Sequence, residues 1–275
     1  SNLNIAVDVS NGMAGLFIRN ILGNKAHYIF EELDGTFPNH EANPLEPKNV
    51  EDIQQLVKQT QADIGVIFDG DADRVMFVDE NSRFISPDLI IALLANHFLK
   101  EKKEGVRVLQ DIRTSKAVGE YVSKFNGEMH MWRVGRAYAA LKLREIDGLF
   151  GGELAGHYYF KEFFYSDSGL MAASLVLNIV SEFKKEGISL SQAISSIEIY
   201  KNSGEINFKI ENKEAAMNAV VEHFRSQGKP DAFYDFDGYR IEFPDWWLNI
   251  RPSNTEPYLR FLAEAKTQEL IDQIV

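Results

Sequence analysis

Cysteine is absent from all 275 residues of the chain. Without it there are neither disulfide bonds nor thiolate metal ligands, and a reducing cytoplasm is the expected location. Long apolar runs are also missing, since no segment reaches the roughly 18 apolar residues that a membrane span requires. Basic residues are few, 29 against 41 acidic ones, which gives a net charge of −12. This balance argues against nucleic acid or an anionic membrane as a partner, because either would need a basic face.

What the sequence does contain is an alternation of strand and helix patterns over its first 200 residues. Short apolar runs that read as buried strands are separated by segments with a helical apolar stripe. The alternation predicts two βαβ-type α/β domains with mixed sheets, at residues 1–83 and 84–199. The pattern then changes to antiparallel strands with helices on one face, which predicts a smaller α+β domain at residues 200–275.

An acidic motif, D-G-D-A-D-R (69–74), directly follows the apolar run I-G-V-I-F. Two unit charges 4 Å apart interact by about 4 kcal/mol at an effective dielectric near 20, so three neighbouring carboxylates need a cation. Oxygen ligands at this spacing suit Mg²⁺. We therefore expect Asp69, Asp71 and Asp73 to bind Mg²⁺ at the end of a strand, where open α/β sheets usually bind ligands. Arg74 must then face another group.

Three other interpretations of this motif remain open on spacing alone. An EF-hand loop also has alternating aspartates, but its required glycine is Arg74 here and the flanks are strands. A phosphatase of the haloacid dehalogenase type places two aspartates after a buried strand, although the expected hydroxyl or small apolar residue does not follow. A solvated acidic turn would have to carry the repulsion without a cation, which favours the metal site.

A second motif lies in L-F-G-G-E-L-A-G-H-Y-Y-F (149–160). Its glycines permit close backbone approach, so Glu153 and His157 can project into a crevice. A glutamate can accept hydrogen bonds from sugar hydroxyls, and a histidine can move protons near neutral pH. Taken alone, the same residues also fit a purely structural turn. The five scattered histidines at positions 27, 40, 97, 130 and 223 are expected to be surface or packing residues.

A third motif is I-R-P-S-N-T-E-P (250–257), between two apolar runs. Arg251 can form two parallel hydrogen bonds to phosphate oxygens, and loop N–H groups can add to them. The residues that add further donors are Ser253, Asn254 and Thr255. The motif has neither the lysine nor the following helix of a P-loop. A polar hairpin turn is the alternative.

Together, and in this order, the three motifs resemble those of the α-D-phosphohexomutase family and, within it, the bacterial phosphomannomutase/phosphoglucomutase branch. The metal loop of that family is D-G-D-x-D-R, its sugar loop is G-E-[MS]-S-G-H, and its phosphate loop is R-x-S-N-T-x-P. The stretches F-P-N-H-E-A-N-P (37–44) and D-S-G (167–169) are also similar to family sequences. The resemblance covers essentially the whole chain.

Departures from the family pattern modify this expectation. Members carry a phosphorylated serine in a T-A-S-H-N-P-type loop of a first domain, and no such stretch occurs here. We therefore expect domains two to four of the family, with almost no mutase activity of their own. Ala155 stands where a serine is usual, Arg136 where many relatives have histidine, and Arg113 where some have lysine. An arginine stays protonated, so these two are expected to hold phosphate or sugar oxygens.

The resemblance implies a reaction as well as a fold. The parent enzyme would interconvert hexose 6-phosphate and hexose 1-phosphate, of mannose, glucose or both, through a phosphoserine and a bisphosphorylated sugar. It implies Mg²⁺ on the three aspartates, Arg74 and His157 as catalytic residues, and Glu153 on sugar hydroxyls. The other substrate-binding residues would be Ala155, Arg136, Arg113, Arg251, Ser253, Asn254 and Thr255.

The expected partners are hexose phosphates and the N-terminal domain of the same protein. Two alternatives remain: a catalytically inactive relative that binds sugar phosphates, and a phosphatase of the haloacid dehalogenase type.

Overall fold

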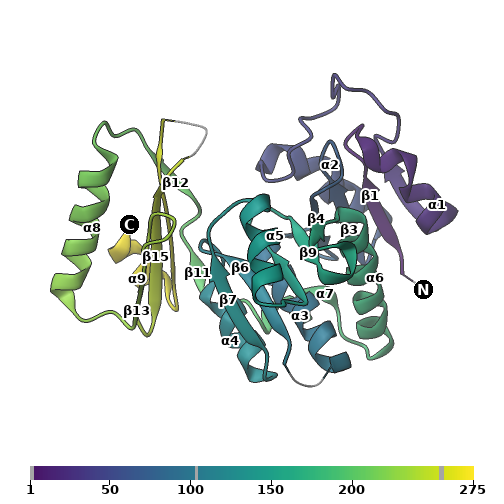
Figure 1. Ribbon diagram of the computed structural model, residues 1–275. Coiled ribbons are helices and arrows are strands. Elements are labelled where there is room, and N and C mark those ends of the chain that lie inside the picture. The colour runs from purple at the N-terminus through teal and green to yellow at the C-terminus, as the bar shows by residue number, and fades with distance from the viewer. Residues whose placement is uncertain (1–2, 103–104, 254–256) are drawn as a thin grey trace.

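Three sheets follow one another along the chain in the computed structural model, which describes residues 3–102, 105–253 and 257–275 (Figure 1). We call the parts built on these sheets the first, second and third domains. The first sheet has the strand order β2-β1-β3-β4-β5. Its first three strands are parallel, and the last two are antiparallel to their neighbours. The elements of this domain are β1 (Ile5–Asp8), α1 (Ile18–Leu22), β2 (Ala26–Ile29), α2 (Glu51–Thr60), β3 (Ile64–Phe68), β4 (Val75–Asp79) and β5 (Phe84–Ile85).

The second domain repeats this plan. Its sheet has the order β10-β9-β8-β6-β7, in which β7, β6 and β8 are parallel and β9 and β10 are antiparallel. Its strands are β6 (Arg107–Asp111), β7 (Glu128–Trp132), β8 (Phe150–Gly152), β9 (Tyr158–Phe160) and β10 (Ser166–Asp167). Its helices are α3 (Pro87–Lys102), α4 (Lys116–Lys124), α5 (Arg136–Glu145), α6 (Gly169–Lys185) and α7 (Leu190–Ser195).

Serine caps fix the starts of α4 and α6 in the second domain. The Ser115 hydroxyl accepts a hydrogen bond from the N–H of Ala117, and the Ser168 hydroxyl accepts one from Met171. Such caps satisfy N–H groups that have no partner within the helix. The buried apolar side chains of α3 and α6 belong to one core that includes strands of both sheets. The first two domains are therefore packed together.

The third domain is an antiparallel sheet with the order β11-β16-β15-β14-β13, and β12 pairs with β16. Figure 1 shows α8 and α9 beside this sheet. Its strands are β11 (Lys201–Asn202), β12 (Ile206–Phe208), β13 (Ala232–Tyr234), β14 (Tyr239–Glu242), β15 (Trp246–Pro252) and β16 (Leu259–Ala265); its helices are α8 (Lys213–Gln227) and α9 (Gln268–Ile274). The predicted fold class, two mixed-sheet α/β domains followed by a smaller α+β domain, is confirmed.

A buried arginine joins the third domain to the second. The Arg240 guanidinium lies 3.7 Å from the centre of the Trp247 ring, and its Nη1 donates to the carbonyl oxygens of Ile112 and Thr114. Trp132 of the second domain stacks on Phe236 of the third. These contacts fix the orientation of the third sheet against the end of β6. Among the helices in the described residues, none combines the length and apolarity needed to cross a membrane.

Candidate functional site

The aspartate loop, residues 69–74, connects the antiparallel strands β3 and β4. Asp69, Asp71 and Asp73 place carboxylate oxygens within 4.8 Å of one another, as the sequence predicted. Burial, with the charges of Asp69 and Asp71, raises the pKa of Asp73 to about 6, although the neighbouring His157 opposes this shift. Asp69 is buried and Asp71 is exposed. Three close, oxygen-only donors at the mouth of a strand fit a hard cation such as Mg²⁺.

Arg74 turns back onto this loop. Its Nε donates to Oδ2 of Asp69 over 2.7 Å, and its Nη1 lies 3.4 Å from Oδ1 of Asn43. Arg74 is therefore held by the first aspartate of the loop and by a residue of the segment before α2. That Arg74 contacts a phosphate remains a prediction.

The sugar loop, residues 153–157, connects β8 and β9 and so occupies the same place in the second sheet. The two loops are in contact, because the N–H of Val75 donates to the carbonyl oxygen of Gly156 over 3.3 Å. Gly156 has φ +87°, and a Cβ there would lie 2.5 Å from Cε of Met76. A Cβ at Gly169 would lie 2.7 Å from the carbonyl oxygen of Ala72. Glycine is thus required at both points where the two domains approach.

Glu153 is buried, with 3% of its surface exposed. Its Oε1 accepts hydrogen bonds from the Tyr159 hydroxyl, over 2.8 Å, and from the N–H of Gly135, over 3.2 Å. Burial and the charge of Asp111 raise the pKa of the Glu153 carboxyl. These contacts hold the side chain in one orientation, as a group that positions a substrate hydroxyl requires.

His157, the last residue of the sugar loop, faces the aspartate loop. Its Nδ1 is 2.8 Å from Oδ2 of the buried Asp167 and 3.8 Å from Oδ1 of Asp73. Burial disfavours the charged imidazole, but the hydrogen bond to Asp167 and the charges of Glu153 and Asp73 outweigh it and raise the pKa of His157. A carboxylate only accepts hydrogen bonds, so Nδ1 carries the hydrogen and Nε2 is the nitrogen available for proton exchange.

Arg136, the first residue of α5, meets the same acidic group. Its Nε lies 2.9 Å from Oδ1 of Asp167, and its Nη1 lies 3.7 Å from Oδ2 of Asp73. More than half of the side chain, 58%, is exposed. A cation fixed at one nitrogen and open to solvent on the other side can still bind an anion.

Arg113 and Ala155 have supporting positions. Arg113 donates from Nε and Nη2 to both oxygens of Asp111, over 3.1 and 2.8 Å. Asp111 Oδ2 also accepts a hydrogen bond from the N–H of Leu154 in the sugar loop. Arg113 therefore supports the sugar loop through Asp111, and its predicted contact with substrate stays a prediction. Ala155 lies in the turn of that loop and offers only its backbone to a polar ligand.

Arg251, on β15, is buried, with 4% of its side chain exposed. Its Nε lies 3.5 Å from Oδ1 of Asp237, whose Oδ2 accepts a hydrogen bond from the N–H of Val134. The N–H of Ser253 donates to the carbonyl oxygen of Tyr258 at the neck of the loop. The predicted contributions of two further residues, Asn254 and Thr255, lie outside the described residues.

The turn before α5 connects these groups. Val134 donates to Asp237, Gly135 donates to Glu153, and Arg136 pairs with Asp167 and Asp73. One short segment thus contacts the phosphate-loop arginine's partner, the sugar-loop glutamate and the aspartate loop. This turn thus connects Glu153, Asp73 and, through Asp237, Arg251 at a junction of the three domains.

Sequence reasoning missed four carboxyl or hydroxyl groups of this junction: Asp111, Tyr159, Asp167 and Asp237. Asp167 lies in the D-S-G stretch that resembles the family, which was a usable signal. The other three lie in no motif: Asp237 pairs with Val134, 103 residues away, whereas Asp111 and Tyr159 have partners two and six residues away that no local pattern identified.

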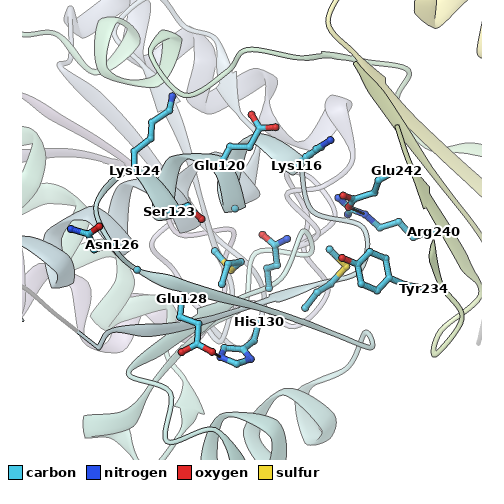
Figure 2. Close-up of a pocket in the computed structure, with 15 residues that line it drawn as sticks. Lys116, Glu120, Ser123, Lys124, Asn126, Glu128, His130, Tyr234, Arg240 and Glu242 are labelled. Carbon is cyan, nitrogen blue, oxygen red and sulfur yellow. Dashed lines mark hydrogen bonds and ion pairs between the residues drawn. The ribbon is translucent and has the colours of Figure 1, made fainter. Parts of the chain in front are cut away.

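A cavity of about 1200 Å³ lies between α4, β7 and the third domain, and Figure 2 shows the residues that line it. Lys116, Glu120 and Arg240 are among the residues that line it. None of the predicted site residues is in its lining. It is therefore separate from the junction described above.

Three models of one protein family match the chain in succession. Residues 1–82 match "Phosphoglucomutase/phosphomannomutase, alpha/beta/alpha domain II", residues 86–200 match domain III of the same family, and residues 205–275 match its C-terminal domain.

Relatives and solved structures agree with these matches. A phosphomannomutase of Methanocaldococcus jannaschii is 37% identical over all of this chain and 60% of its own length. A phosphoglucomutase of Neisseria gonorrhoeae is 32% identical over 99% of this chain and 59% of its own length. The crystal structure of a phosphoglucomutase/phosphomannomutase family protein from Burkholderia thailandensis has a TM-score of 0.86 at 29% identity, covering 99% of this chain and 58% of the other.

The fold is shared more widely. An N-acetylphosphoglucosamine mutase of Aspergillus fumigatus, solved with GlcNAc-6P and magnesium, has a TM-score of 0.67 at 14% identity, covering 99% of this chain and 64% of the other. The chain thus spans about 60% of the length of the curated relatives it matches.

Proposed function

The chain belongs to the phosphoglucomutase/phosphomannomutase family, of which it comprises domains II, III and the C-terminal domain, and we propose that it holds the metal, sugar and phosphate sites of a phosphohexomutase. The parent enzyme interconverts hexose 6-phosphate and hexose 1-phosphate, of mannose, glucose or both. The phosphoryl group passes through a serine in a domain outside this chain and through a bisphosphorylated sugar. We place the domain boundaries near residues 83 and 200. The observation that carries the proposal is that the turn at residues 134–136 contacts the aspartate loop, Glu153 of the sugar loop and Asp237, the ion-pair partner of Arg251.

Asp69, Asp71 and Asp73 would hold Mg²⁺, and the raised pKa of Asp73 supports this assignment because clustered carboxylates favour a cation. When bound, the ion supplies charge neutralisation at a transferring phosphoryl group. Arg74 lies on the same loop, where it can contact phosphoryl oxygens. The magnesium in the Aspergillus fumigatus structure is a property of that protein, and it makes Mg²⁺ the first ion to test here.

Glu153 binds sugar hydroxyls in this proposal. Its Oε1 is fixed by Tyr159 and Gly135, so the carboxylate is oriented before the sugar arrives. His157 lies beside it and exchanges a proton at Nε2 with the hydroxyl that gains or loses the phosphoryl group. Asp167 holds the ring and stabilises its charged form.

In this proposal, Arg251 and Arg136 each bind a phosphate beside the sugar site. Arg251 is buried and faces its ion-pair partner Asp237, and Arg136 is exposed and faces the aspartate loop. Two anion sites around one sugar site explain how a hexose phosphate binds in either of two orientations. Ser253, Asn254 and Thr255 are assigned to the phosphate held by Arg251.

A coupled assay on the full-length enzyme tests the proposal. Mannose 1-phosphate and glucose 1-phosphate should each be offered with Mg²⁺ and a trace of hexose 1,6-bisphosphate, and turnover of at least one is expected. Absence of turnover of both, in an enzyme that folds and carries its phosphoserine, contradicts the proposal. The chain described here should bind these sugar phosphates without turning them over.

A non-catalytic relative that binds sugar phosphates is the second candidate. Arg136 replaces the histidine of many relatives, and Ala155 replaces a serine. The same assay separates the two candidates, because such a relative binds the sugar phosphates and produces no product even with the phosphoserine domain present.

A further inference from the structure

The segment at residues 37–43, within F-P-N-H-E-A-N-P, lies against the aspartate loop, yet the proposed reaction gives it no role. A Cβ placed at Gly70 would lie 3.2 Å from the Phe37 ring and 3.4 Å from Cβ of Ala42. Asn43 places Oδ1 3.4 Å from Nη1 of Arg74. Three residues of the segment therefore contact the loop, through packing and through one polar contact. We call residues 37–43 the strap.

His40 fastens the strap to β1. Its Nε2 lies 3.0 Å from Oδ2 of Asp8, and its Nδ1 lies 2.8 Å from the carbonyl oxygen of Glu41. Only 6% of the His40 side chain is exposed, and none of the Asp8 side chain. His40 is thus a packed rather than a surface residue, with its ring edge-on to Phe30, and it is hydrogen-bonded as well. Both ring nitrogens face an acceptor, and a neutral imidazole can donate from only one of them.

Asp8 continues the connection to the aspartate loop. Its Oδ1 accepts a hydrogen bond from the N–H of Ser10, and the Ser10 hydroxyl donates to the carbonyl oxygen of Phe68 over 2.6 Å. Phe68 is the residue directly before Asp69. His40 is thereby linked to the start of the aspartate loop through two buried residues.

The backbone around this connection is strained. Ser10 and Asn11 have φ +53° and +52°, Phe37 has φ +50°, and Ala72 in the aspartate loop has φ +64°. Residues other than glycine adopt this region at a cost, which the surrounding contacts must balance. The strap, the turn after β1 at residues 10–11 and the aspartate loop therefore stabilise one another in backbone conformations that are unfavourable in isolation.

We infer that the strap positions the aspartate loop, and that an ion pair between a His40 imidazolium and the Asp8 carboxylate holds the strap in place. His40 is then a positioning residue of the metal site. The inference rests on the proposed role of the loop as the Mg²⁺ site, but the state of His40 can be tested without metal or substrate.

Charged groups around the pair set its dependence on pH. The hydrogen bond to Asp8 raises the pKa of His40 against the effect of burial, and the charge of Asp52 on α2 adds to the increase. Burial raises the pKa of Asp8, although His40 opposes this. The Glu41 side chain lies 3.6 Å from Lys48. Both members of the pair are therefore charged at pH values between the pKa of Asp8 and the pKa of His40. The ion pair is lost when His40 loses its proton as pH rises through the pKa of His40.

Nitrogen-15 NMR of the metal-free chain with labelled histidine tests the charge. At pH 7, a signal with both ring nitrogens protonated and in slow exchange should be present that disappears in His40→Gln and remains in His157→Gln. A neutral ring at this position contradicts the inference directly. His157 is the other histidine with a raised pKa, so the assignment uses His40→Gln and His157→Gln in parallel.

Hydrogen exchange and metal binding test the positioning role. In His40→Gln and in Asp8→Asn, the amides of Ala72 and Arg74, which donate hydrogen bonds to Asp69 within the aspartate loop, should lose protection at pH 7. Affinity for Mn²⁺, used as a probe, should fall about tenfold or more. The matched control is His27→Gln, an exposed histidine on β2, which should change neither. Because a glutamine could disturb folding, thermal unfolding of each variant is recorded.

The outcomes separate this inference from the proposed function. Unchanged exchange at the amides of Ala72 and Arg74 in a folded His40→Gln variant overturns the positioning role. Loss of the imidazolium signal at pH values where the aspartate loop keeps its protection overturns the ion pair as the fastening. Failure of the mutase assay, by contrast, overturns the proposed reaction and leaves the His40 measurements as they stand.

Discussion

Arg251 and Asp237 form an ion pair, with Nε of Arg251 3.5 Å from Oδ1 of Asp237. Oδ2 of Asp237 accepts a hydrogen bond from the N–H of Val134 in the second domain, over 2.8 Å. Burial lowers the pKa of Arg251, so its guanidinium gains from an anion placed beside it. Asp237, which the second domain holds through Val134, therefore orients Arg251 of the phosphate loop.

Replacing Arg251 by alanine is expected to weaken binding of mannose 1-phosphate by roughly tenfold to a hundredfold, since a charge-assisted hydrogen bond contributes about 1.5–3 kcal/mol. Isothermal titration calorimetry on this chain with Mg²⁺ measures the change. The control is Arg107→Ala, an exposed arginine that pairs with Glu128. Equal affinity in the Arg251 variant would remove the phosphate role.

Asp73→Asn is expected to stabilise the metal-free chain at neutral pH and to remove its stabilisation by Mg²⁺. The pKa of Asp73 is raised to about 6 in the folded chain, above its ordinary value of 3.8. The folded chain therefore becomes less stable as pH rises from about 4 through about 6, because it holds this proton more tightly than the unfolded chain does. The difference in melting temperature between variant and parent should therefore grow from pH 4 to pH 7. Thermal unfolding with and without Mg²⁺ measures both effects, and a constant difference over this range contradicts the assignment.

Asp167→Asn should change the tautomer of His157. The Asp167 carboxylate accepts from Nδ1 at 2.8 Å and so selects the ring with hydrogen on Nδ1, whereas an asparagine can also donate. Nitrogen-15 shifts of the His157 ring report the tautomer in this chain, and kcat of the full-length enzyme should fall more than KM changes. Asp147→Asn, an exposed aspartate of the same domain, serves as control. Identical ring shifts in parent and variant would exclude this role for Asp167.

Glu264→Gln is expected to stabilise the chain above pH 7. Glu264 is buried where the second and third domains meet, and its Oε2 accepts hydrogen bonds from Ser115 and from Trp247. Burial and the charge of Asp88 raise its pKa to about 7 from 4.5, so the folded state loses stability as pH rises through about 7. The variant should gain a few degrees in melting temperature at pH 8 and little at pH 4. An equal change at both pH values rules out titration of Glu264 as the cause.

Local sequence was sufficient for the aspartate loop. The buried run before Asp69 predicted the strand, and the spacing of the three carboxylates predicted that they converge, as they do within 4.8 Å. Helix starts at Ser115 and Ser168 were predictable for the same reason, because a cap depends on its own neighbours. Features decided within one turn of chain were therefore accessible from the sequence.

Contacts between remote segments were not accessible. Val134 and Asp237 lie 103 residues apart, and His40 and Asp8 lie 32 apart, without a pattern in either segment that names the other. One local contact was missed as well, because the pairing of Arg113 with Asp111, two residues away, depends on a side-chain conformation that the sequence does not determine. His40 illustrates the same limit, because a histidine is charged or neutral according to what folding places at its two nitrogens.

The turn at residues 134–136 has a consequence for attempts to redesign specificity. Its three residues contact Asp237, which pairs with Arg251, then Glu153 and Asp73. A one-residue insertion there should therefore displace the proposed metal, sugar and phosphate sites together. A substitution at Glu153 or at Arg251 would alter only the proposed sugar site or the proposed phosphate site, while the turn keeps the spacing of the other sites. Sugars of a different size are therefore better accommodated by substituting the residues of one binding site than by lengthening the turn at residues 134–136.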